Sequence, residues 1–303
     1  MDLQGRKTQL GVSVSIASSM VFSVVFVYSA YLNFSANVLF GWRVTFTVIM
    51  LAAFLTLTRR WRVLRILARR IAQRPVRGLA LLLTAAIVGT QIWLFTWAPA
   101  AGRGLPVALG YFILPIVLAF IGRVVFRERL GPWRTASVII AVLAVIYQFW
   151  QVGGVAWETA VVAIGYPIYF MVRRLAGIGG SSGLTAEMML VMPVALILLV
   201  GDDPTLTTLT HPKFAFTLAG FGTLASIGLL LYIAASQFLP LSLFGLLSYL
   251  EPILLALAAA LVLGEALNVT ELATYLAIGL ALLLLAAETF ARARPPRNEP
   301  LVG

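Results

Sequence analysis

The sequence predicts an all-α membrane protein of ten transmembrane helices, arranged as two inverted five-helix repeats around a central cavity. Three observations predict this class: the composition, the spacing of long apolar stretches, and two similar sequence segments in different parts of the chain. Of the 303 residues, 61% are hydrophobic and 11% are charged, whereas a soluble domain has about 45–50% apolar and about 25% charged residues. One water-soluble core cannot bury such an excess, so a polytopic membrane protein is expected.

Ten stretches are long and apolar enough to cross a bilayer, which takes about 20 mostly apolar residues. They cover residues 9–31, 36–58, 77–99, 104–126, 133–150, 155–174, 184–201, 214–237, 240–263 and 267–290. We expect the first stretch to stay in the mature chain, because no convincing A-x-A cleavage site accompanies it. The polar end, residues 292–303, is expected to be a disordered cytoplasmic tail.

The basic residues predict the orientation of the chain. With the N-terminus in the cytoplasm, every lysine and arginine except Arg43, Arg103 and Lys213 falls in or beside a cytoplasmic segment. Cytoplasmic loops are rich in lysine and arginine, so both termini are expected in the cytoplasm, in a bacterial-type inner membrane. The arginine-rich segment 59–77 is open to two interpretations, an amphipathic surface helix or a plain loop that sets topology.

A net charge of +11 raises the question of nucleic acid. No soluble region is large enough for a nucleic-acid-binding domain. In a chain this apolar, the arginines are expected to contact anionic lipid headgroups instead, so the lipid bilayer is a partner and nucleic acid is not.

The fourth and ninth stretches contain similar sequence segments. "LPIVLAFIGRVVFRERL" (114–130) aligns with "EPILLALAAALVLGEAL" (251–267), with proline and glutamate matched near the ends. The two copies lie five stretches apart, an odd number, so the second would enter the membrane in the opposite sense. The loop after Glu128 carries arginines, and the loop around Glu265 has none, as inversion predicts. We therefore expect repeats at 1–152 and 153–291. Inverted repeats are typical of secondary transporters, which bind substrate near mid-membrane.

Two charged residues stand out within the predicted spans. Glu251 lies near the middle of the ninth span, where an ionisable group is costly and usually faces a wet cavity or the bundle interior. It would bind a substrate amine or take up a proton, or it would lock two helices together. Arg43, in the second span, would form an ion pair, snorkel to the surface or attract a substrate carboxylate.

Pro115 and Pro252 each remove a backbone hydrogen bond within a span and free a carbonyl. Such breaks are tolerated where protein or a cavity supplies a partner. Their matched positions predict helix kinks at the cavity, and the alternative is a kink that serves packing only. Glu158 and Glu187 lie near span ends, where we expect them to face headgroup water.

The residues also resemble a known family. "IWLFTWA" (92–98), "LGYFILP" (109–115), "GYPIYFMVRRLA" (165–176) and "LSYLEP" (247–252) with "GEAL" (264–267) are similar to the drug/metabolite transporter superfamily, EamA-type, in its RarD/YddG branch. The chain departs from that branch at Leu114 and Glu251, which precede the two prolines, and at Trp42, where the branch has histidine. These departures bear on the substrate and leave the architecture unchanged.

The resemblance implies a cavity walled by the first, third, fourth, sixth, eighth and ninth spans. It also implies export of small metabolites from the cytoplasm, amino acids with aromatic or apolar side chains in YddG-like members and drugs in RarD-like members. Several side chains on these spans are then candidates to contact substrate, aromatic ones by stacking: Gln91, Trp93, Trp97, Tyr111, Tyr166, Tyr169 and Tyr249. Aromatic residues of membrane proteins are often interfacial anchors instead, which suits Trp61, Trp133, Trp150 and Trp157.

Several function classes are excluded by absences in the sequence. There is no cysteine, the one histidine is His211, and the two lysines, Lys7 and Lys213, are outside glycine-rich loops. A P-loop pump, a thiolate or multi-histidine metal site and a serine–histidine pair are therefore not expected. The sequence predicts no enzyme, no cofactor and no metal.

The predicted function is secondary transport by alternating access, with amino acids as the first substrate class. Drug or other metabolite efflux is the alternative of the same class. A membrane binding or scaffold protein without transport is the alternative of another class, although a scaffold has no need of inverted symmetry. Transport would be facilitated diffusion or proton exchange through Glu251. We expect a monomer, and a dimer is left open.

Overall fold

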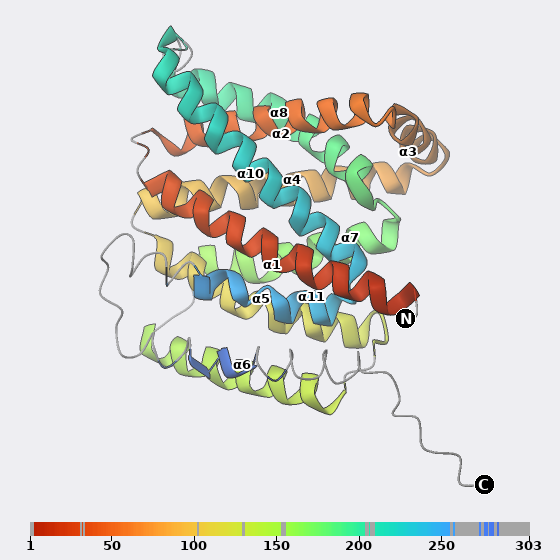
Figure 1. Cartoon of the computed structure of the whole chain (residues 1–303), viewed down its shortest axis with the longest axis vertical. Coiled ribbons are helices and arrows are strands. Elements are labelled where there is room, and N and C mark those ends of the chain that lie inside the picture. Colours follow the sequence, from red (N-terminus) through yellow and green to blue (C-terminus); the bar gives the residue numbers. More distant parts are fainter. Residues whose placement is uncertain are drawn as a thin grey trace, which may run out of the picture.

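The computed structural model describes residues 3–30, 32, 34–101, 103–128, 131–152, 156–203, 206, 210–254, 257, 273, 276–277, 279–281 and 284. Every regular element in these ranges is an α-helix (Figure 1). In chain order they are α1 (Leu3–Ala30), α2 (Ala36–Leu57), α3 (Trp61–Gln73), α4 (Pro75–Ala100), α5 (Gly104–Val124), α6 (Pro132–Val152), α7 (Trp157–Ala176), α8 (Gly180–Asp202), α10 (Pro212–Phe238) and α11 (Leu241–Leu247).

Eight of these helices occupy eight of the predicted stretches, namely α1, α2, α4, α5, α6, α7, α8 and α10. The ninth stretch begins with α11 and is helical again at residues 250–254. Most of its remainder and of the tenth stretch lies outside the described residues, as does Glu265. Five described segments are long and apolar enough to span a membrane: Arg6–Phe26, Ala36–Leu57, Pro75–Ala98, Gly180–Asp202 and Pro212–Phe238. The chain is therefore a multi-pass helical membrane protein.

The basic segment after α2 is a helix. α3 lies beyond the end of α2 and the start of α4 (Figure 1) and packs against α4 and α8. Its apolar residues gather on one face, where Leu67 is buried with Leu81 of α4 and Ile178, which precedes α8. Of the two interpretations of this segment, the amphipathic helix is therefore the one observed.

The bundle is built mainly from helices that are distant in sequence. α1 packs against α10, α2 against α8 and α10, α5 against α7 and α11, and α4 against α7 and α8. α6 lies at one edge of the bundle in Figure 1 and packs against α5 and α11. The first and second halves of the chain therefore form one core rather than two separate ones.

Buried hydroxyl groups join the helices inside this core. Ser18 Oγ donates to the carbonyl of Gly228 over 3.0 Å, which links α1 to α10. The hydroxyls of Thr47 and Ser226 lie 2.8 Å apart and link α2 to α10. Without water in the bilayer core, such hydrogen bonds and close packing hold helices together in place of a hydrophobic driving force.

α5 and α7 lie in close contact at Gly110. A Cβ placed there would lie 2.7 Å from the Cβ of Val162 and 2.9 Å from the carbonyl oxygen of Thr159, both on α7. No side chain larger than hydrogen fits such a separation without moving backbone. Glycine at this position therefore permits the contact that brings α5 and α7 together around the central pocket.

Candidate functional site

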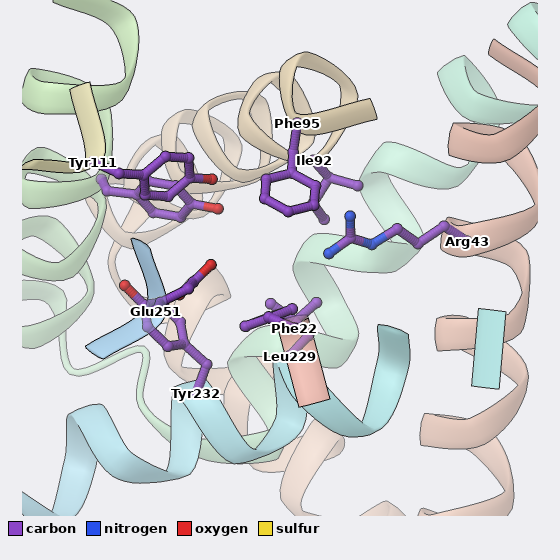
Figure 2. A pocket seen from close by; sticks show the side chains of 9 residues that line it. Phe22, Arg43, Ile92, Phe95, Tyr111, Leu229, Tyr232 and Glu251 are labelled. Atoms are coloured by element: carbon purple, nitrogen blue, oxygen red, sulfur yellow. The ribbon is translucent and has the colours of Figure 1, made fainter. Parts of the chain in front are cut away.

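A buried pocket lies where seven helical segments converge. Figure 2 shows its wall, to which α1, α2, α4, α5, α7, α10 and the short helical segment 250–254 contribute. The lining residues are Phe22, Arg43, Ile92, Phe95, Tyr111, Tyr166, Leu229, Tyr232 and Glu251. Six of these segments coincide with the spans that the resemblance implied, and α2 adds Arg43.

Two charged groups face this pocket from opposite sides. Figure 2 shows the guanidinium of Arg43 and the carboxylate of Glu251 both pointing into it. Arg43 is 4% exposed and Glu251 is 6% exposed. The Nε and Nη1 atoms of Arg43 are buried and have no hydrogen-bond partner among the described residues. The guanidinium instead lies 5.9 Å from the ring centre of Phe22 and 5.5 Å from that of Phe95.

Three tyrosines form the aromatic part of the wall. The rings of Tyr111 and Tyr166 lie 6.1 Å apart between centroids, and those of Tyr166 and Tyr232 lie 6.3 Å apart. Phe95 meets Tyr111 edge to face at 6.1 Å. An aromatic wall with phenolic hydroxyls offers an apolar surface and hydrogen-bonding groups at the same place.

The pocket is contracted in this conformation. The volume that the centre of a water molecule can occupy in the pocket is about 20 Å³. One buried water needs about 10–15 Å³ by the same measure. The volume therefore suits a water molecule rather than a metabolite. A larger ligand requires the surrounding helices to separate.

The structure brings four of the predicted site residues to this pocket: Arg43, Tyr111, Tyr166 and Glu251. Pro252 is buried next to Glu251. The side chain of Pro115 lies outside the described residues, although α5 runs through its position. Sequence reasoning missed the other five lining residues. They all lie on spans expected to wall the cavity, which was the available signal: Phe22, Ile92, Phe95, Leu229 and Tyr232.

The other predicted residues lie elsewhere. Trp93 stacks on Trp97 at 5.3 Å between ring centroids and donates its indole hydrogen to Asn37 Oδ1 over 2.9 Å. Gln91 donates to the carbonyl of Val161 over 2.7 Å, which joins α4 to α7. Tyr249 is fully buried, and its hydroxyl has no hydrogen-bond partner among the described residues.

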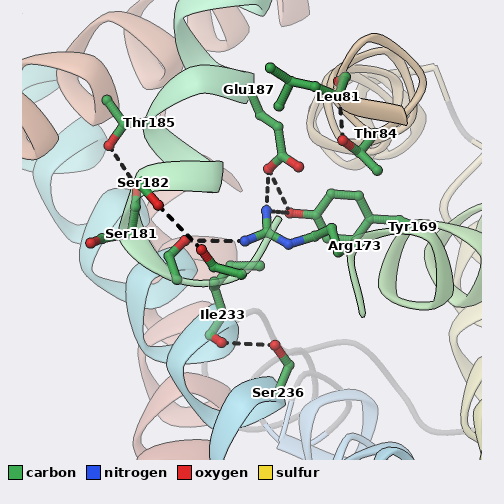
Figure 3. A network of polar contacts seen from close by, with 12 residues as sticks. Leu81, Thr84, Tyr169, Arg173, Ser181, Ser182, Thr185, Glu187, Ile233 and Ser236 are labelled. Atoms are coloured by element: carbon green, nitrogen blue, oxygen red, sulfur yellow. Dashed lines mark hydrogen bonds and ion pairs between the residues drawn. The ribbon is translucent and has the colours of Figure 1, made fainter. Parts of the chain in front are cut away.

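Tyr169 belongs to a separate polar network between α7 and α8. Figure 3 shows the guanidinium of Arg173 between Tyr169, Glu187 and the turn that joins the two helices. Arg173 pairs with Glu187, donates to Tyr169 Oη over 2.8 Å, and donates to the carbonyl of Gly180 over 3.2 Å. Tyr169 in turn donates to Glu187 over 3.0 Å. The network therefore links the C-terminal part of α7 to the N-terminal part of α8.

The expectation that Glu158 and Glu187 face headgroup water is wrong. Both residues are fully buried, because each has an arginine partner that the sequence separation concealed. Arg103 holds Glu158 in a two-point contact, with Nε to Oε1 at 2.6 Å and Nη2 to Oε2 at 3.0 Å. The hydrogen bond to Glu158 and its negative charge raise the pKa of Arg103, which precedes α5.

A second interhelical contact lies at the other end of α5. Glu128 Oε1 accepts a hydrogen bond from Arg174 Nη1 of α7 over 2.8 Å and from the backbone N–H of Leu241, at the start of α11, over 2.8 Å. The guanidinium of Arg174 also lies 4.3 Å from the ring centre of Phe126. One carboxylate therefore ties the ends of three helices.

Known proteins resemble this chain over most of its length. It is 37% identical over 277 residues to the chloramphenicol-sensitive protein RarD of Pseudomonas aeruginosa, covering 90% of this chain and 92% of that protein. It is 33% identical over 275 residues to an uncharacterized transporter of Haemophilus influenzae, covering 90% and 92%. The chain belongs to the RarD-type transporter family.

Further likenesses agree with a RarD-type assignment. The protein RarD of Salmonella typhimurium is 28% identical over 284 residues, with 92% of this chain and 95% of that protein covered. One solved crystal structure has the same fold, with a TM-score of 0.58 at 15% identity over 94% of this chain and 96% of that chain. No protein-family model matches the chain.

Membership of the RarD-type family confirms the predicted transporter class and the RarD part of the resemblance. The names of the relatives point to transporters, and a transporter is generally not an enzyme. Across the described part of this RarD-type chain, no group of three histidine, cysteine, aspartate or glutamate side chains is placed to hold a metal ion.

Proposed function

We propose that the protein is a secondary transporter that exports amino acids with aromatic or apolar side chains from the cytoplasm by alternating access. The observation that carries the proposal is the pair of opposite charges in the tyrosine-lined pocket. A zwitterion has a carboxylate for Arg43 and an ammonium group for Glu251. Tyr111, Tyr166 and Tyr232 would then contact the side chain of the amino acid.

The cost of these two charges supports a functional role. Charged side chains within a membrane are expensive and usually pair or line a substrate pathway. Arg43 is buried but leaves two nitrogen atoms without partners among the described residues. A purely structural arginine would gain by pairing, as Arg173 does with Glu187. An arginine held open beside a cavity is suited to a ligand with a negative charge.

The pairing of the helices supports inverted repeats. If α1, α2, α4 and α5 are equivalent to α7, α8, α10 and α11, each contact between the halves should have an equivalent. α1 packs on α10 as α7 packs on α4, and α2 packs on α10 as α8 packs on α4. α2 with α8 and α5 with α11 pair each helix with its own equivalent. Such two-fold organisation suits alternating access around a fixed central site.

The proposal places the protein in a bacterial-type inner membrane, as a monomer with both termini in the cytoplasm, because the arginines then face the cytoplasm. Since the pocket is contracted in this conformation, the proposed cycle opens it to the cytoplasm, loads substrate and then opens it to the other side. Pro115 and Pro252 each lack the backbone N–H of an ordinary helical residue, and the weaker helix at these positions would let the two walls move against each other.

Drug efflux is the second candidate, because one relative is named a chloramphenicol-sensitive protein. A neutral drug would use the aromatic wall and would have less need of two opposite charges. Loss of amino acid transport in Arg43→Gln and Glu251→Gln, with unchanged transport of a neutral drug, would show that only amino acid transport depends on the two charges.

Proteoliposomes that contain the full chain test the proposal. They are loaded with labelled phenylalanine, leucine or lysine, and efflux is measured against liposomes without protein. We expect efflux of phenylalanine and leucine above that of lysine. No efflux of any amino acid from vesicles with correctly folded protein would overturn amino acid export, and no flux of any tested solute would favour a scaffold. Arg59→Gln, on the exposed segment before α3, serves as a charge-matched control for Arg43→Gln.

A further inference from the structure

An apolar groove opens beside α3, between α4 and α8. Near α3 it has a volume of about 670 Å³. Its floor is formed by Leu64 and Ile71 of α3, Leu81 of α4, and Met189 and Leu190 of α8. None of these residues belongs to the central pocket, so the groove is a separate feature.

The groove continues along α4 and α8, away from α3. A second section, with a volume of about 740 Å³, shares Leu190 with the first and extends to Trp93 of α4 and Leu198 of α8. From Leu81 to Trp93 an α-helix rises about 18 Å, close to the roughly 15 Å depth of one leaflet of the hydrocarbon core. The groove therefore has the length of one acyl chain.

The groove faces the membrane along its length. Leu82 and Val194 line it, and each is 56% exposed. Both belong to segments that are long and apolar enough to span a bilayer. At this depth the surroundings are the hydrocarbon of the bilayer, so a lipid acyl chain is the molecule available to fill the groove.

Arginines stand at the end of the groove that lies next to α3. Arg65 lines the groove itself, beside Trp61. Arg62, Arg65 and Arg69 are spaced so that they share one face of α3, and all three are exposed. Trp61 is held in place by the hydrogen bond from its indole nitrogen to Thr56 Oγ1, at 3.1 Å. The groove thus ends beside a row of three arginines on α3, of which Arg65 lines the groove itself.

We infer that this groove binds an anionic phospholipid, with one acyl chain between α4 and α8 and the headgroup phosphate on Arg62, Arg65 and Arg69. Guanidinium groups suit phosphate because they offer paired N–H donors in a planar fork. Charge complementarity selects an anionic lipid over a zwitterionic one. The lipid would fix α3 against α4 and α8 and does not depend on which solute the central pocket accepts.

Native mass spectrometry of the full-length protein in detergent tests the inference, with phosphatidylglycerol and phosphatidylcholine of identical chains as probes. We expect retention of phosphatidylglycerol and not of phosphatidylcholine. The triple variant Arg62→Gln, Arg65→Gln, Arg69→Gln should retain about a hundredfold less, because each arginine near an anionic surface contributes about fivefold. Equal retention of both lipids by the unaltered protein would overturn the headgroup assignment.

A charge-matched triple variant controls for the loss of positive charge. Arg70→Gln, Arg74→Gln and Arg77→Gln remove the same number of charges from the same segment, outside the row of three arginines, and should weaken lipid retention far less than the first triple variant does. If both triple variants lose lipid equally, a general electrostatic attraction replaces the site. Competition by inorganic phosphate at the same concentration as lipid phosphate would show a simple anion site instead.

The acyl-chain part of the inference has its own variant. Ala68 lines the groove and is exposed, so Ala68→Trp would fill the space without changing charge or disturbing a buried contact. We expect several-fold weaker retention of phosphatidylglycerol with an unchanged elution profile in size-exclusion chromatography. Normal retention by Ala68→Trp would show that the chain lies elsewhere. This variant also decides the matter if the arginine triple variant fails to fold.

Discussion

Arg43 and Glu251 point into the same buried pocket from opposite sides, and among the described ion pairs neither side chain is joined to the other. The two residues come from α2 and from the helical segment 250–254 after α11, which belong to different halves of the chain. In contrast to Arg173 and Glu187, which pair directly, Arg43 keeps two buried nitrogen atoms without a hydrogen-bond partner among the described residues.

Neutralising either charge should weaken binding of amino acids. Glu251→Gln and Arg43→Gln each remove a charge-assisted hydrogen bond, worth about 1.5–3 kcal/mol, so the apparent affinity should fall by about tenfold to a hundredfold. Inhibition of phenylalanine efflux by unlabelled phenylalanine measures this change. The amino acid amide, which lacks the carboxylate, should be affected by Glu251→Gln and little by Arg43→Gln. The reverse pattern would exchange the two assigned roles.

Proton coupling makes a second prediction about Glu251. If this carboxyl carries the exchanged proton, efflux by the unaltered protein should vary with pH, and Glu251→Gln should remove that variation because an amide does not titrate. Glu187→Gln is the matched control, since Glu187 is also buried in the bundle but lies outside the pocket. An unchanged pH profile in Glu251→Gln would remove Glu251 from the role of proton carrier.

The Arg173–Glu187 pair should matter for stability. Arg173→Met leaves Glu187 buried without its partner, and loss of one member of a buried pair costs about 3–5 kcal/mol. The double variant Arg173→Met, Glu187→Leu removes both charges and should be more stable than Arg173→Met alone. The midpoint of thermal unfolding in detergent measures both. A double variant less stable than the single one would mean that the remaining hydrogen bonds, not the isolated charge, set the cost.

Close packing of α5 on α7 depends on Gly110. Gly110→Ala would place a Cβ 2.7 Å from that of Val162, and such overpacking typically costs about 1–3 kcal/mol. Val162→Ala in the same chain should recover little, because the Cβ of Val162 and the backbone oxygen of Thr159 remain in place. Gly179→Ala, at a position with nothing within 4 Å, is the control that should unfold as the natural chain does. The unfolding midpoint again decides.

The sequence was sufficient to predict an all-helical membrane fold and eight helix positions, because long apolar stretches can satisfy their backbone hydrogen bonds in lipid only by forming helices or closed barrels. It also indicated Glu251 and Arg43, since intramembrane charges are rare enough to notice singly. It did not predict the burial of Glu158 or Glu187, because their arginine partners depend on tertiary packing. The sequence also did not predict that Trp93 and Tyr169 would contact neighbouring side chains instead of the cavity, because their positions along the helices do not reveal those contacts.

The contacts between α5 and α7 have a consequence for how the polypeptide can be divided. Arg103, just before α5, holds Glu158 in the first turn of α7, and Glu128, just after α5, holds Arg174 in the last turn of α7. The two helices therefore run in the same direction and are fastened at both ends, with one in each half of the chain. Two separately synthesised fragments, 1–152 and 156–303, should therefore associate in the membrane and co-purify without a covalent link.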